Sequence, residues 1–490
     1  MNKTALIIGS GLGGLATALR LEKNGYSVRI IEKEKTAGGR LNILEKDGFT
    51  FDIGPSFFSM SYEFKELFDY LEIDIPFELN ELNPLYTVFI EGNEKPYKIY
   101  KDLDKLAAEF KHIEPNFKKE VKKYLLGAKN VFHDTEYKII KRNFDSLWQY
   151  MISMSKVPKK HLPKMFRTFW GELERYFESE DVKIIFSLVA FFLGATPFNT
   201  PAVYGLLNYT ELEHDGYWNV KGGMYNIVRG ILGLMKERDI EITYSTEIKN
   251  VDYQGDEING FIDQDGKKWE ADVYVVNADA AAFRGKMLGR KKYSEKKLDK
   301  MDWTLSPFTI YLGVKGKIPG IEHHNYFLGD NFKEYADTIF RTEVTPKKPY
   351  YYVNVASKSN PNCAPEGHEN IFILCPVPDL RVKPDWSDAQ TLADEIIEDL
   401  GSRVDYDIKN NIVSKTVYTP TEWQDKFNLY RGSGLGLAHG LKQIGALRPA
   451  NKDEVFDNVY YVGASTHPGT GLPIVVIGSR LVTERILNEH

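Results

Sequence analysis

Residues 4–40, "TALIIGSGLGGLATALRLEKNGYSVRIIEKEKTAGGR", decide how this chain folds. The apolar stretch over residues 4–8 predicts a short strand, and a glycine-rich turn follows it. Leu15 and Leu19 share one face of the helix that comes next, and Gly25 ends that helix. A second apolar strand is expected over residues 27–31. The order strand, turn, helix, strand predicts a βαβ unit with parallel strands.

The turn inside this unit has the spacing of a dinucleotide-binding fingerprint. Gly9 would make the tight turn, Gly11 would let a pyrophosphate approach the backbone, and Gly14 would pack the helix on the strand. Glu32 follows about 20 residues later, where a carboxylate accepts hydrogen bonds from ribose hydroxyls. It would repel a 2′-phosphate, which disfavours NADP. The residues expected to bind the nucleotide here are Gly9, Gly11, Gly13, Gly14, Glu32 and Lys33.

The composition is that of an ordinary soluble protein of two or three domains. The chain has 490 residues, of which 42% are hydrophobic and 27% charged, and its net charge is −6. This balance gives no bias toward nucleic acid. The two cysteines, Cys363 and Cys375, exclude a disulfide framework and a Cys-rich metal site, and they favour a reducing cytoplasm as the location. We expect no metal, and we expect both thiols to be buried structural groups.

No apolar stretch is long enough to cross a bilayer. The nearest, residues 184–198, is more typical of a buried or interfacial helix. Lys3 and the apolar run after it resemble the start of a signal peptide, but four glycines break the run. We therefore expect residues 4–31 to be the first βαβ unit.

The pattern after residue 40 alternates between sheet and helix. A hairpin is expected at residues 47–48, a turn at 54–55, a helix around 64–71 and a lysine-rich helical region over 102–170. Gly222 and Gly223 are expected to open a helix that runs to Met235. Strands over 240–244 and 273–276, with hairpins at 255–256 and 265–266 between them, indicate a return to the nucleotide domain.

The rest of the chain predicts a second, α+β domain. Strands are expected over 308–316, 351–357 and 371–378, and a helix over 388–400. Thr419 and Glu422 form a capping box with Pro420 at the first helical position. Near the end, residues 460–487 read "YYVGASTHPGTGLPIVVIGSRLVTERIL", a strand, a Gly/Pro-rich turn and a helix. Such a turn brings backbone N–H groups close to a phosphate or a ring edge.

These motifs together resemble the FAD-dependent amine-oxidase-like superfamily. The chain is most similar to the bacterial-type carotenoid desaturases, the phytoene desaturase family with its 1-hydroxycarotenoid 3,4-desaturase branch. The resemblance covers essentially the whole chain, and its most specific segments are "FTFDIGPS", "APEGHENIFILCPVP" and "YYVGASTHPGTGLPIVVIGS". It implies an α/β fold with a Rossmann-type FAD domain assembled from residues 1–75, 211–290 and 441–490. Residues 76–210 would form a helical, membrane-facing part of an α+β substrate domain, and residues 291–440 its sheet and helices.

The resemblance also implies a set of FAD-binding residues. Glu32 would hold the ribose, and Gly38, Gly39 and Arg40 would lie beside the pyrophosphate, with Arg40 donating charge-assisted hydrogen bonds. Ile248 would meet the adenine through its backbone. The C-terminal turn would line the isoalloxazine with Gly463, Thr466, Gly471, Pro473 and Ile474. Gly54, Pro55, Asn277 and Leu472 complete the expected set.

Desaturation removes two hydrogens from adjacent carbons of a polyene. No protein side chain accepts a hydride, so flavin N5 would take it, and a proton would then leave the neighbouring carbon. We assign no base. His467 could serve as a base or tune the flavin, but it could equally be an idle histidine packed at the cofactor. Arg448 resembles a residue near the flavin in the family, and a surface salt bridge is the alternative.

One segment decides which carotenoid and which desaturation we expect. Residues 54–64, "GPSFFSMSYEF", lack the Pro and Trp of many phytoene enzymes. This favours 3,4-desaturation of a hydroxylated or monocyclic (γ-carotene type) carotenoid, with phytoene desaturation as the alternative. The sequence also leaves open a different flavin amine oxidase with an aromatic cage, a carotenoid isomerase, and a non-redox binding protein of the GDP-dissociation-inhibitor type.

A carotenoid is dissolved in membrane, and one segment suits a membrane surface. Residues 138–170 combine many Lys and Arg with Phe, Trp, Tyr and Met. Such a segment could dock on the anionic inner face of the cell membrane, although a solvated basic helical face is the alternative. The expected electron acceptor is oxygen or a quinone.

Overall fold

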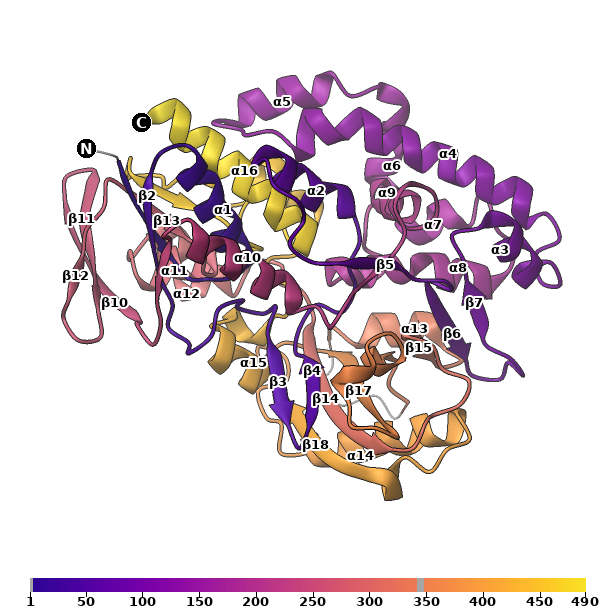
Figure 1. Cartoon of the computed structure of the whole chain (residues 1–490). Coiled ribbons are helices and arrows are strands. Elements are labelled where there is room, and N and C mark those ends of the chain that lie inside the picture. The colour runs from indigo at the N-terminus through magenta and orange to yellow at the C-terminus, as the bar shows by residue number, and fades with distance from the viewer. Residues whose placement is uncertain (1–2, 342–347) are drawn as a thin grey trace.

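The structure is a computed structural model that describes residues 3–341 and 348–490. Figure 1 shows a parallel sheet with its helices near both chain termini, a helical region beside it, and a mixed sheet below. The helices are α1 (Leu12–Lys23), α2 (Ser61–Tyr70), α3 (Leu103–Phe110), α4 (Phe117–Thr135), α5 (Leu147–Ser155), α6 (Leu162–Phe166), α7 (Phe169–Leu173), α8 (Glu180–Ser187), α9 (Leu206–Tyr209), α10 (Asn226–Glu237), α11 (Ala280–Lys286), α12 (Glu295–Leu298), α13 (Phe332–Thr338), α14 (Ala389–Arg403), α15 (Pro420–Phe427) and α16 (Leu472–Glu489).

The strands belong to two main sheets and three small ones. They are β1 (Thr4–Ile8), β2 (Ser27–Ile31), β3 (Ile43–Lys46), β4 (Phe49–Asp52), β5 (Leu79–Glu81), β6 (Tyr86–Ile90), β7 (Tyr97–Ile99), β8 (Trp218–Val220), β9 (Glu241–Thr243), β10 (Ile248–Gln254), β11 (Glu257–Asp263), β12 (Lys268–Trp269), β13 (Val273–Val276), β14 (Ser306–Lys315), β15 (His324–Leu328), β16 (Tyr351–Asn354), β17 (His368–Val377), β18 (Ile412–Tyr418) and β19 (Val459–Tyr461).

The parallel sheet has the order β19-β13-β1-β2-β9 and draws its strands from three separate parts of the chain. Ile7 of β1 lies opposite Val275 of β13 on one side and Ile30 of β2 on the other. The strands read as apolar runs because both faces of the sheet are covered. Helices α1, α10 and α16 pack against one face, and the β10–β12 sheet against the other. The predicted three-segment Rossmann-type fold is confirmed, whereas the domain boundaries at 75, 210, 290 and 440 stay predictions.

The glycines of the first turn have the geometry that the fingerprint requires. Gly9 has φ +98°, a conformation that residues with a Cβ rarely adopt. A Cβ on Gly14 would lie 2.4 Å from the carbonyl oxygen of Gly9, so no other residue could pack α1 this closely on β1.

One helix begins later than predicted. Gly222 and Gly223 have φ values of +82° and +101°, so they form a turn, and α10 starts at Asn226. The Asp52 carboxylate accepts hydrogen bonds from the N–H groups of Met224 (2.9 Å) and Tyr225 (3.2 Å) at that helix start. Burial nevertheless raises the pKa of Asp52 to about 6.

The second main sheet has seven strands in the order β18-β14-β17-β16-β15-β6-β7. Its residues alternate between two cores, as the period of two in a strand requires. Phe327 and Tyr351 belong to the core under α14, whereas Tyr326 and Tyr352 belong to the core shared with the helical region. The predicted capping box of α15 is present, and Cys363 and Cys375 are both buried, as expected.

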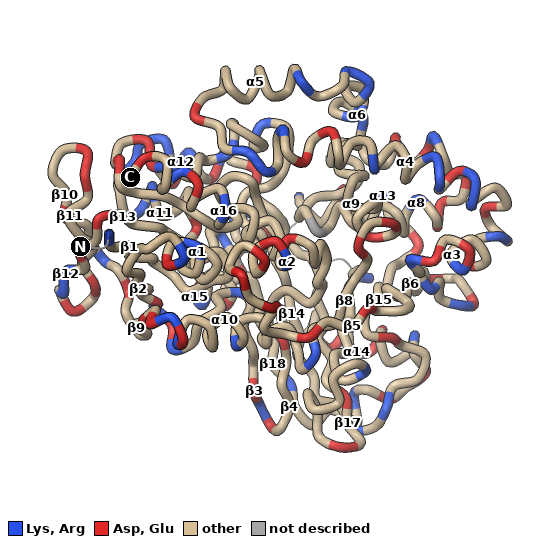
Figure 2. The backbone as a smooth tube through the Cα atoms, turned by 45° about the horizontal axis from the view of Figure 1, so that its top comes forward, with Lys and Arg blue, Asp and Glu red and all other residues tan. Residues whose placement is uncertain are grey.

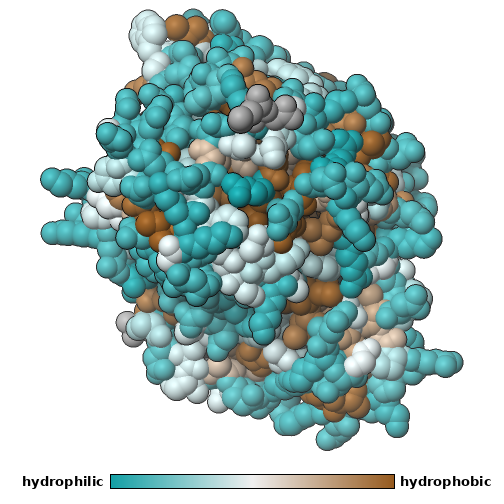
Figure 3. Space-filling model, turned by 60° about the vertical axis from the view of Figure 1, so that its left-hand side comes forward, coloured by the Kyte–Doolittle hydropathy of each residue, from teal (hydrophilic) through white to brown (hydrophobic). Residues whose placement is uncertain are grey.

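The helical region beside the parallel sheet comprises α3 to α9 (Figure 1). Residues 102–170 hold α3 to α6, as the pattern predicted, but the chain leaves helical conformation at 142–146 before Ser146 caps α5. Helix α8 ends at Ser187 and continues as a largely buried 3₁₀ stretch, Leu188–Leu193. Among the described residues, no helix has both the length and the apolarity to cross a membrane. The face in Figure 3 is mostly hydrophilic, with hydrophobic residues in separate small groups.

Candidate functional site

One large cavity lies where the parallel sheet, the helical region and the seven-stranded sheet meet. Its volume is about 1750 Å³, which exceeds the roughly 300–1,000 Å³ of a typical single-ligand pocket. The cavity can therefore hold a cofactor and a second ligand together. Its lining brings together seventeen of the residues predicted to bind the cofactor, namely Gly9, Gly11, Gly13, Glu32, Lys33, Gly38, Gly39, Arg40, Gly54, Pro55, Ile248, Asn277, Gly463, Gly471, Leu472, Pro473 and Ile474.

At the nucleotide end, Glu32 holds the glycine turn in place. Its carboxylate accepts hydrogen bonds from the N–H and the hydroxyl of Ser10, both at 2.7 Å, and from the N–H of Glu34 at 2.9 Å. The start of α1 is directed at this end, and the first N–H groups of a helix have no partner within it. These groups and the helix dipole suit an anionic pyrophosphate.

Asn277 supports the same turn from the neighbouring strand. Its side-chain amide donates to the carbonyl oxygens of Gly9 (3.2 Å) and Gly11 (3.1 Å). A Cβ on Gly11 would lie 2.8 Å from the Asn277 Nδ2 atom. Asn277, which was predicted to bind the cofactor, therefore positions the backbone of the glycine turn.

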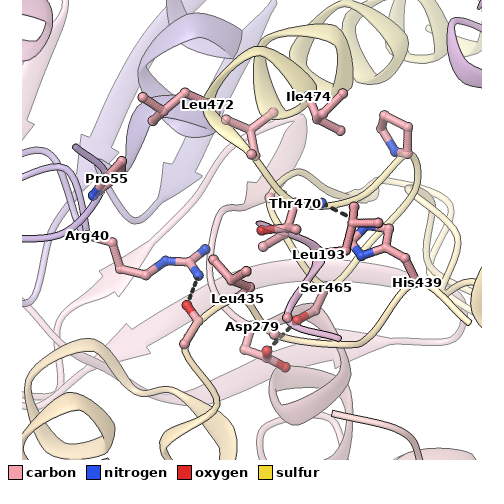
Figure 4. Close-up of a pocket in the computed structure, with 18 of the residues that line it drawn as sticks. Arg40, Pro55, Leu193, Asp279, Leu435, His439, Ser465, Thr470, Leu472 and Ile474 are labelled. Carbon is pink, nitrogen blue, oxygen red and sulfur yellow. Dashed lines mark hydrogen bonds between the residues drawn. The ribbon is translucent and has the colours of Figure 1, made fainter. Parts of the chain in front are cut away.

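We call the predicted cofactor-binding residues that line the cavity the cradle. At the end of the cradle away from Glu32, polar side chains gather near the C-terminal turn (Figure 4). Arg40 donates from Nη1 to the carbonyl oxygen of Gly434 at 2.7 Å, and burial lowers its pKa while Asp279 opposes that change. The Asp279 carboxylate caps α11 at the Ala282 N–H (2.9 Å) and accepts the Ser465 hydroxyl. Burial raises the pKa of Asp279. Sequence reasoning did not select Asp279, although its place just after a parallel strand was a usable signal.

His439 is a second lining residue that the sequence did not reveal. The N–H of Thr470 donates to its Nε2 atom at 3.3 Å, and Leu193 lies on the same side of the cavity (Figure 4). Burial, with Arg448 nearby, holds the pKa of His439 well below its usual range, so the imidazole is neutral. His439 lies in an irregular loop, where no periodic pattern marks it.

Three predicted residues do not line the cavity. Gly14 lies behind it, where α1 packs on β1. Thr466 was expected to line the isoalloxazine, but its hydroxyl donates to the carbonyl oxygens of Pro449 and Ala450, both at 2.9 Å. Arg448 is buried and directs its N–H groups to five carbonyl oxygens, those of Leu437, Ala438, Gln443, Ala464 and Thr466. Because a guanidinium has five N–H donors, none remains for a substrate. Arg448 is therefore neither a surface salt bridge nor a catalytic group; it joins two loops.

His467 does line the cavity. Its Nε2 atom lies 2.9 Å from the carbonyl oxygen of Arg142, so Nε2 carries the proton and donates. Burial lowers the pKa of His467 to about 4. The ring is thus neutral near pH 7 and ties the C-terminal turn to the helical region.

This burial makes stability depend on pH. Between pH 6.5 and about 4 the unfolded chain binds a proton at His467 that the folded chain does not bind. The stabilisation is complete above pH 6.5 and is lost as the pH falls through about 4. From pH 6.5 to 4.5 we expect His467 to account for about 2–3 kcal/mol of the loss. The fall of Tm over this range should be smaller in His467→Gln, whose amide can still donate to Arg142; an unchanged slope would contradict the prediction.

Exposed apolar side chains gather on and around α5 and α6, beside the cavity, and we call them the apolar rim. The rim comprises Tyr137, Leu147, Trp148, Met151, Ile152, Leu162 and Phe166, and Trp148 and Phe166 are 73% and 78% exposed. Met151, Leu162 and Phe166 also line the cavity. Figure 2 shows basic residues along the chain between α5 and α6, where Lys156 and Lys159 are exposed. Neither of these two lysines forms a salt bridge within the described chain.

The cradle fits FAD. Its glycines leave room for a pyrophosphate, its acidic residue suits a ribose, and Gly471, with φ +115°, turns the start of α16 toward the cavity. The family model for flavin containing amine oxidoreductase matches residues 12–487. The chain is 32% identical over 486 residues to a zeta-carotene-forming phytoene desaturase of Myxococcus xanthus, covering 98% of this chain and 93% of that one. It is 29% identical over 495 residues to a carotenoid 3,4-desaturase of Haloarcula japonica, covering 99% and 98%.

Solved structures agree on the fold. The cyclohexylamine oxidase of Brevibacterium oxydans superposes with a TM-score of 0.61 at 14% sequence identity, over 100% of this chain and 99% of that one. At this identity the likeness concerns the fold alone. The family match and the cradle establish the cofactor class. The chain belongs to the flavin-containing amine oxidoreductase family, in the branch that holds the carotenoid desaturases, and is an FAD-dependent oxidoreductase.

Proposed function

We propose that this protein is a carotenoid desaturase that introduces a C=C bond into a long polyene. The observation that carries the proposal is one continuous cavity, lined by the FAD cradle and by Met151, Leu162 and Phe166 of the apolar rim. A small polar substrate needs neither such a volume nor an apolar rim. A polyene dissolved in lipid needs both, because its apolar surface must leave the membrane without crossing water.

Bound FAD supplies the hydride acceptor of the reaction. The chain contributes the rest. Apolar side chains such as Phe191 and Leu193 line the path and exclude water from the polyene. His439 and His467 are neutral at the cavity wall, so either imidazole could accept the departing proton, and we assign this step to neither.

We also propose that the rim docks on the inner face of the cell membrane, with oxygen or a quinone as the final acceptor. Exposed apolar side chains beside unpaired lysines are typical of peripheral binding to anionic lipid. Raising the salt concentration should weaken binding to anionic liposomes, because salt screens the lysines. Equal retention at low and high salt would show that the lysines contribute nothing.

We propose that the reaction is 3,4-desaturation of a hydroxylated or monocyclic carotenoid, with phytoene desaturation as the alternative. Relatives named for both activities match over nearly the full chain at similar identity, so the choice rests on residues 54–64. The segment begins in the cavity wall, where Ser56 and Phe57 follow the cradle residue Pro55.

The step is tested by expressing the chain in cells that accumulate phytoene and in cells that accumulate hydroxylated or γ-carotene type carotenoids. Chromatography of the extracts should show unchanged phytoene and a hydroxylated or monocyclic carotenoid with one further double bond. Neurosporene or lycopene from phytoene would instead establish the alternative. If yellow, FAD-loaded protein leaves every one of these carotenoids unchanged, the proposed function is wrong.

A further inference from the structure

Three tyrosines and a phenylalanine gather on one part of the cavity wall. They are Phe57, Tyr217, Tyr326 and Tyr352, and we call them the tyrosine box. The Phe57 ring centroid lies 4.9 Å from that of Tyr217, 5.0 Å from Tyr352 and 6.2 Å from Tyr326. Tyr326 and Tyr352 are cross-strand partners of β15 and β16, with ring centroids 5.4 Å apart. The box is therefore rigid, because Phe57 contacts all three tyrosine rings and the sheet pairs Tyr326 with Tyr352.

The box lies close to the cradle. Phe57 is only two residues beyond Pro55, which lies beside Arg40 and Leu472 in the cradle (Figure 4). An extended residue spans at most about 3.3–3.6 Å, so the Cα atoms of Pro55 and Phe57 are within about 7 Å of each other. A group held in the box would thus belong to the part of the substrate that lies nearest the flavin.

The hydroxyls of the box differ in their partners. The Tyr352 hydroxyl lies 2.6 Å from the Nδ1 atom of His324, and Tyr217 and Tyr86 lie close enough to the Glu211 carboxyl to favour its charged form. No hydrogen bond joins the Tyr326 hydroxyl to another described residue, and the side chain lines the cavity although the residue is only 8% exposed. This hydroxyl is therefore open to the cavity, where it can pair with a polar group that enters.

The box is close to neutral. His324 and Glu211 lie behind it and do not line the cavity. Burial holds the pKa of His324 well below its usual range, so that ring carries no charge. Burial also raises the pKa of Glu211 to about 7, against hydrogen bonds from Tyr86, Asn208 and Tyr217, and no salt bridge to this carboxyl is found among the described residues. Glu211 is thus only partly ionised near pH 7, and with no positive charge behind the box a neutral oxygen suits it better than an anion does.

We propose that the tyrosine box is a specificity subsite that binds a hydroxyl group of the substrate, close to the carbon–carbon bond that is desaturated. The proposal rests on the proposed function and names its substrate class, a polyene with an oxygenated end group. Tyr326 donates to the substrate oxygen, and a lone pair of the Tyr352 hydroxyl oxygen accepts from it. A hydrocarbon end would leave the Tyr326 hydroxyl unpaired.

The test is a binding measurement that needs no turnover. Purified, FAD-loaded protein is titrated against a 1-hydroxylated acyclic carotenoid and against its hydrocarbon parent, each in neutral detergent micelles. Binding is read from the shift of the carotenoid's visible absorption band. We expect the hydroxylated ligand to bind about tenfold more tightly, and Tyr326→Phe to remove most of this preference while leaving the hydrocarbon's Kd unchanged.

Tyr418→Phe is the matched control, because Tyr418 lies in the same sheet, is buried and does not line the cavity. It should keep the preference. Equal affinities of the native protein for the two ligands would overturn the proposal, as would a preference that Tyr326→Phe leaves intact. Tighter binding of a long-chain primary amine than of either carotenoid would also overturn it, by showing that the box selects a cation. Product analysis decides the proposed function separately, so either can fail alone.

Discussion

Gly471→Val should give soluble protein that has lost its FAD. Gly471 precedes α16 with φ +115°, and its Cβ position meets only Ile474 at an ordinary 3.4 Å. The substitution therefore acts through the backbone, since a β-branched residue at this φ costs on the order of 1–3 kcal/mol and the turn will relax. Relaxation moves the first turn of α16 away from the cradle. We expect FAD binding to weaken by about tenfold to a hundredfold, measured as flavin absorbance per protein after gel filtration.

Gly440→Val is the control for this substitution. Gly440 lies in a neighbouring loop with φ −66°, and a Cβ there would meet nothing within 4 Å. It should retain normal flavin content. If Gly471→Val also kept a full complement of FAD, the C-terminal turn would not be part of the flavin site.

Replacing Trp148 and Phe166 together by glutamate should abolish membrane docking without loss of FAD. Both side chains belong to the exposed apolar rim, and neither is part of the FAD cradle. Burying one such side chain stabilises by about 1.5–3 kcal/mol, so losing two, even if only partly buried in lipid, should cut liposome binding by at least about tenfold. Cosedimentation with anionic liposomes measures this, and turnover of a liposome-borne carotenoid should fall with it.

The matched change is Tyr253→Glu, at an exposed aromatic residue on the β10–β12 hairpin sheet. It should leave liposome binding unaltered. Retained cosedimentation of the Trp148 and Phe166 double variant would place the membrane contact elsewhere on the molecule.

Local signals in the sequence predicted most of the cradle. Gly9, Gly11 and Gly14 are read from spacing, because each is required by a turn or a close approach that no other residue permits. Glu32 follows from its place at the end of a strand. Resemblance added the C-terminal turn, and the structure brings that turn and the fingerprint to one cavity although they are more than 400 residues apart in the sequence.

The sequence could not reveal side-chain direction in irregular loops. Thr466 and Arg448 were assigned to the flavin site by resemblance, yet both bond to backbone carbonyls of nearby loops. His439 was missed because long-range packing, rather than periodicity, turns it into the cavity, whereas Asp279 had a usable signal in its place just after a parallel strand. Long-range packing also hid the tyrosine box, because its members come from two separate loops and from two strands whose pairing the sequence does not specify.

The most direct test of the whole account is an anaerobic single turnover. FAD-loaded protein is mixed with a hydroxylated acyclic carotenoid in liposomes, and the flavin spectrum and the carotenoid mass are followed together. The account predicts loss of the oxidised flavin absorbance and a product lighter by two hydrogens, in equal amounts. A product of unchanged mass with the flavin still oxidised would contradict desaturation and indicate an isomerase.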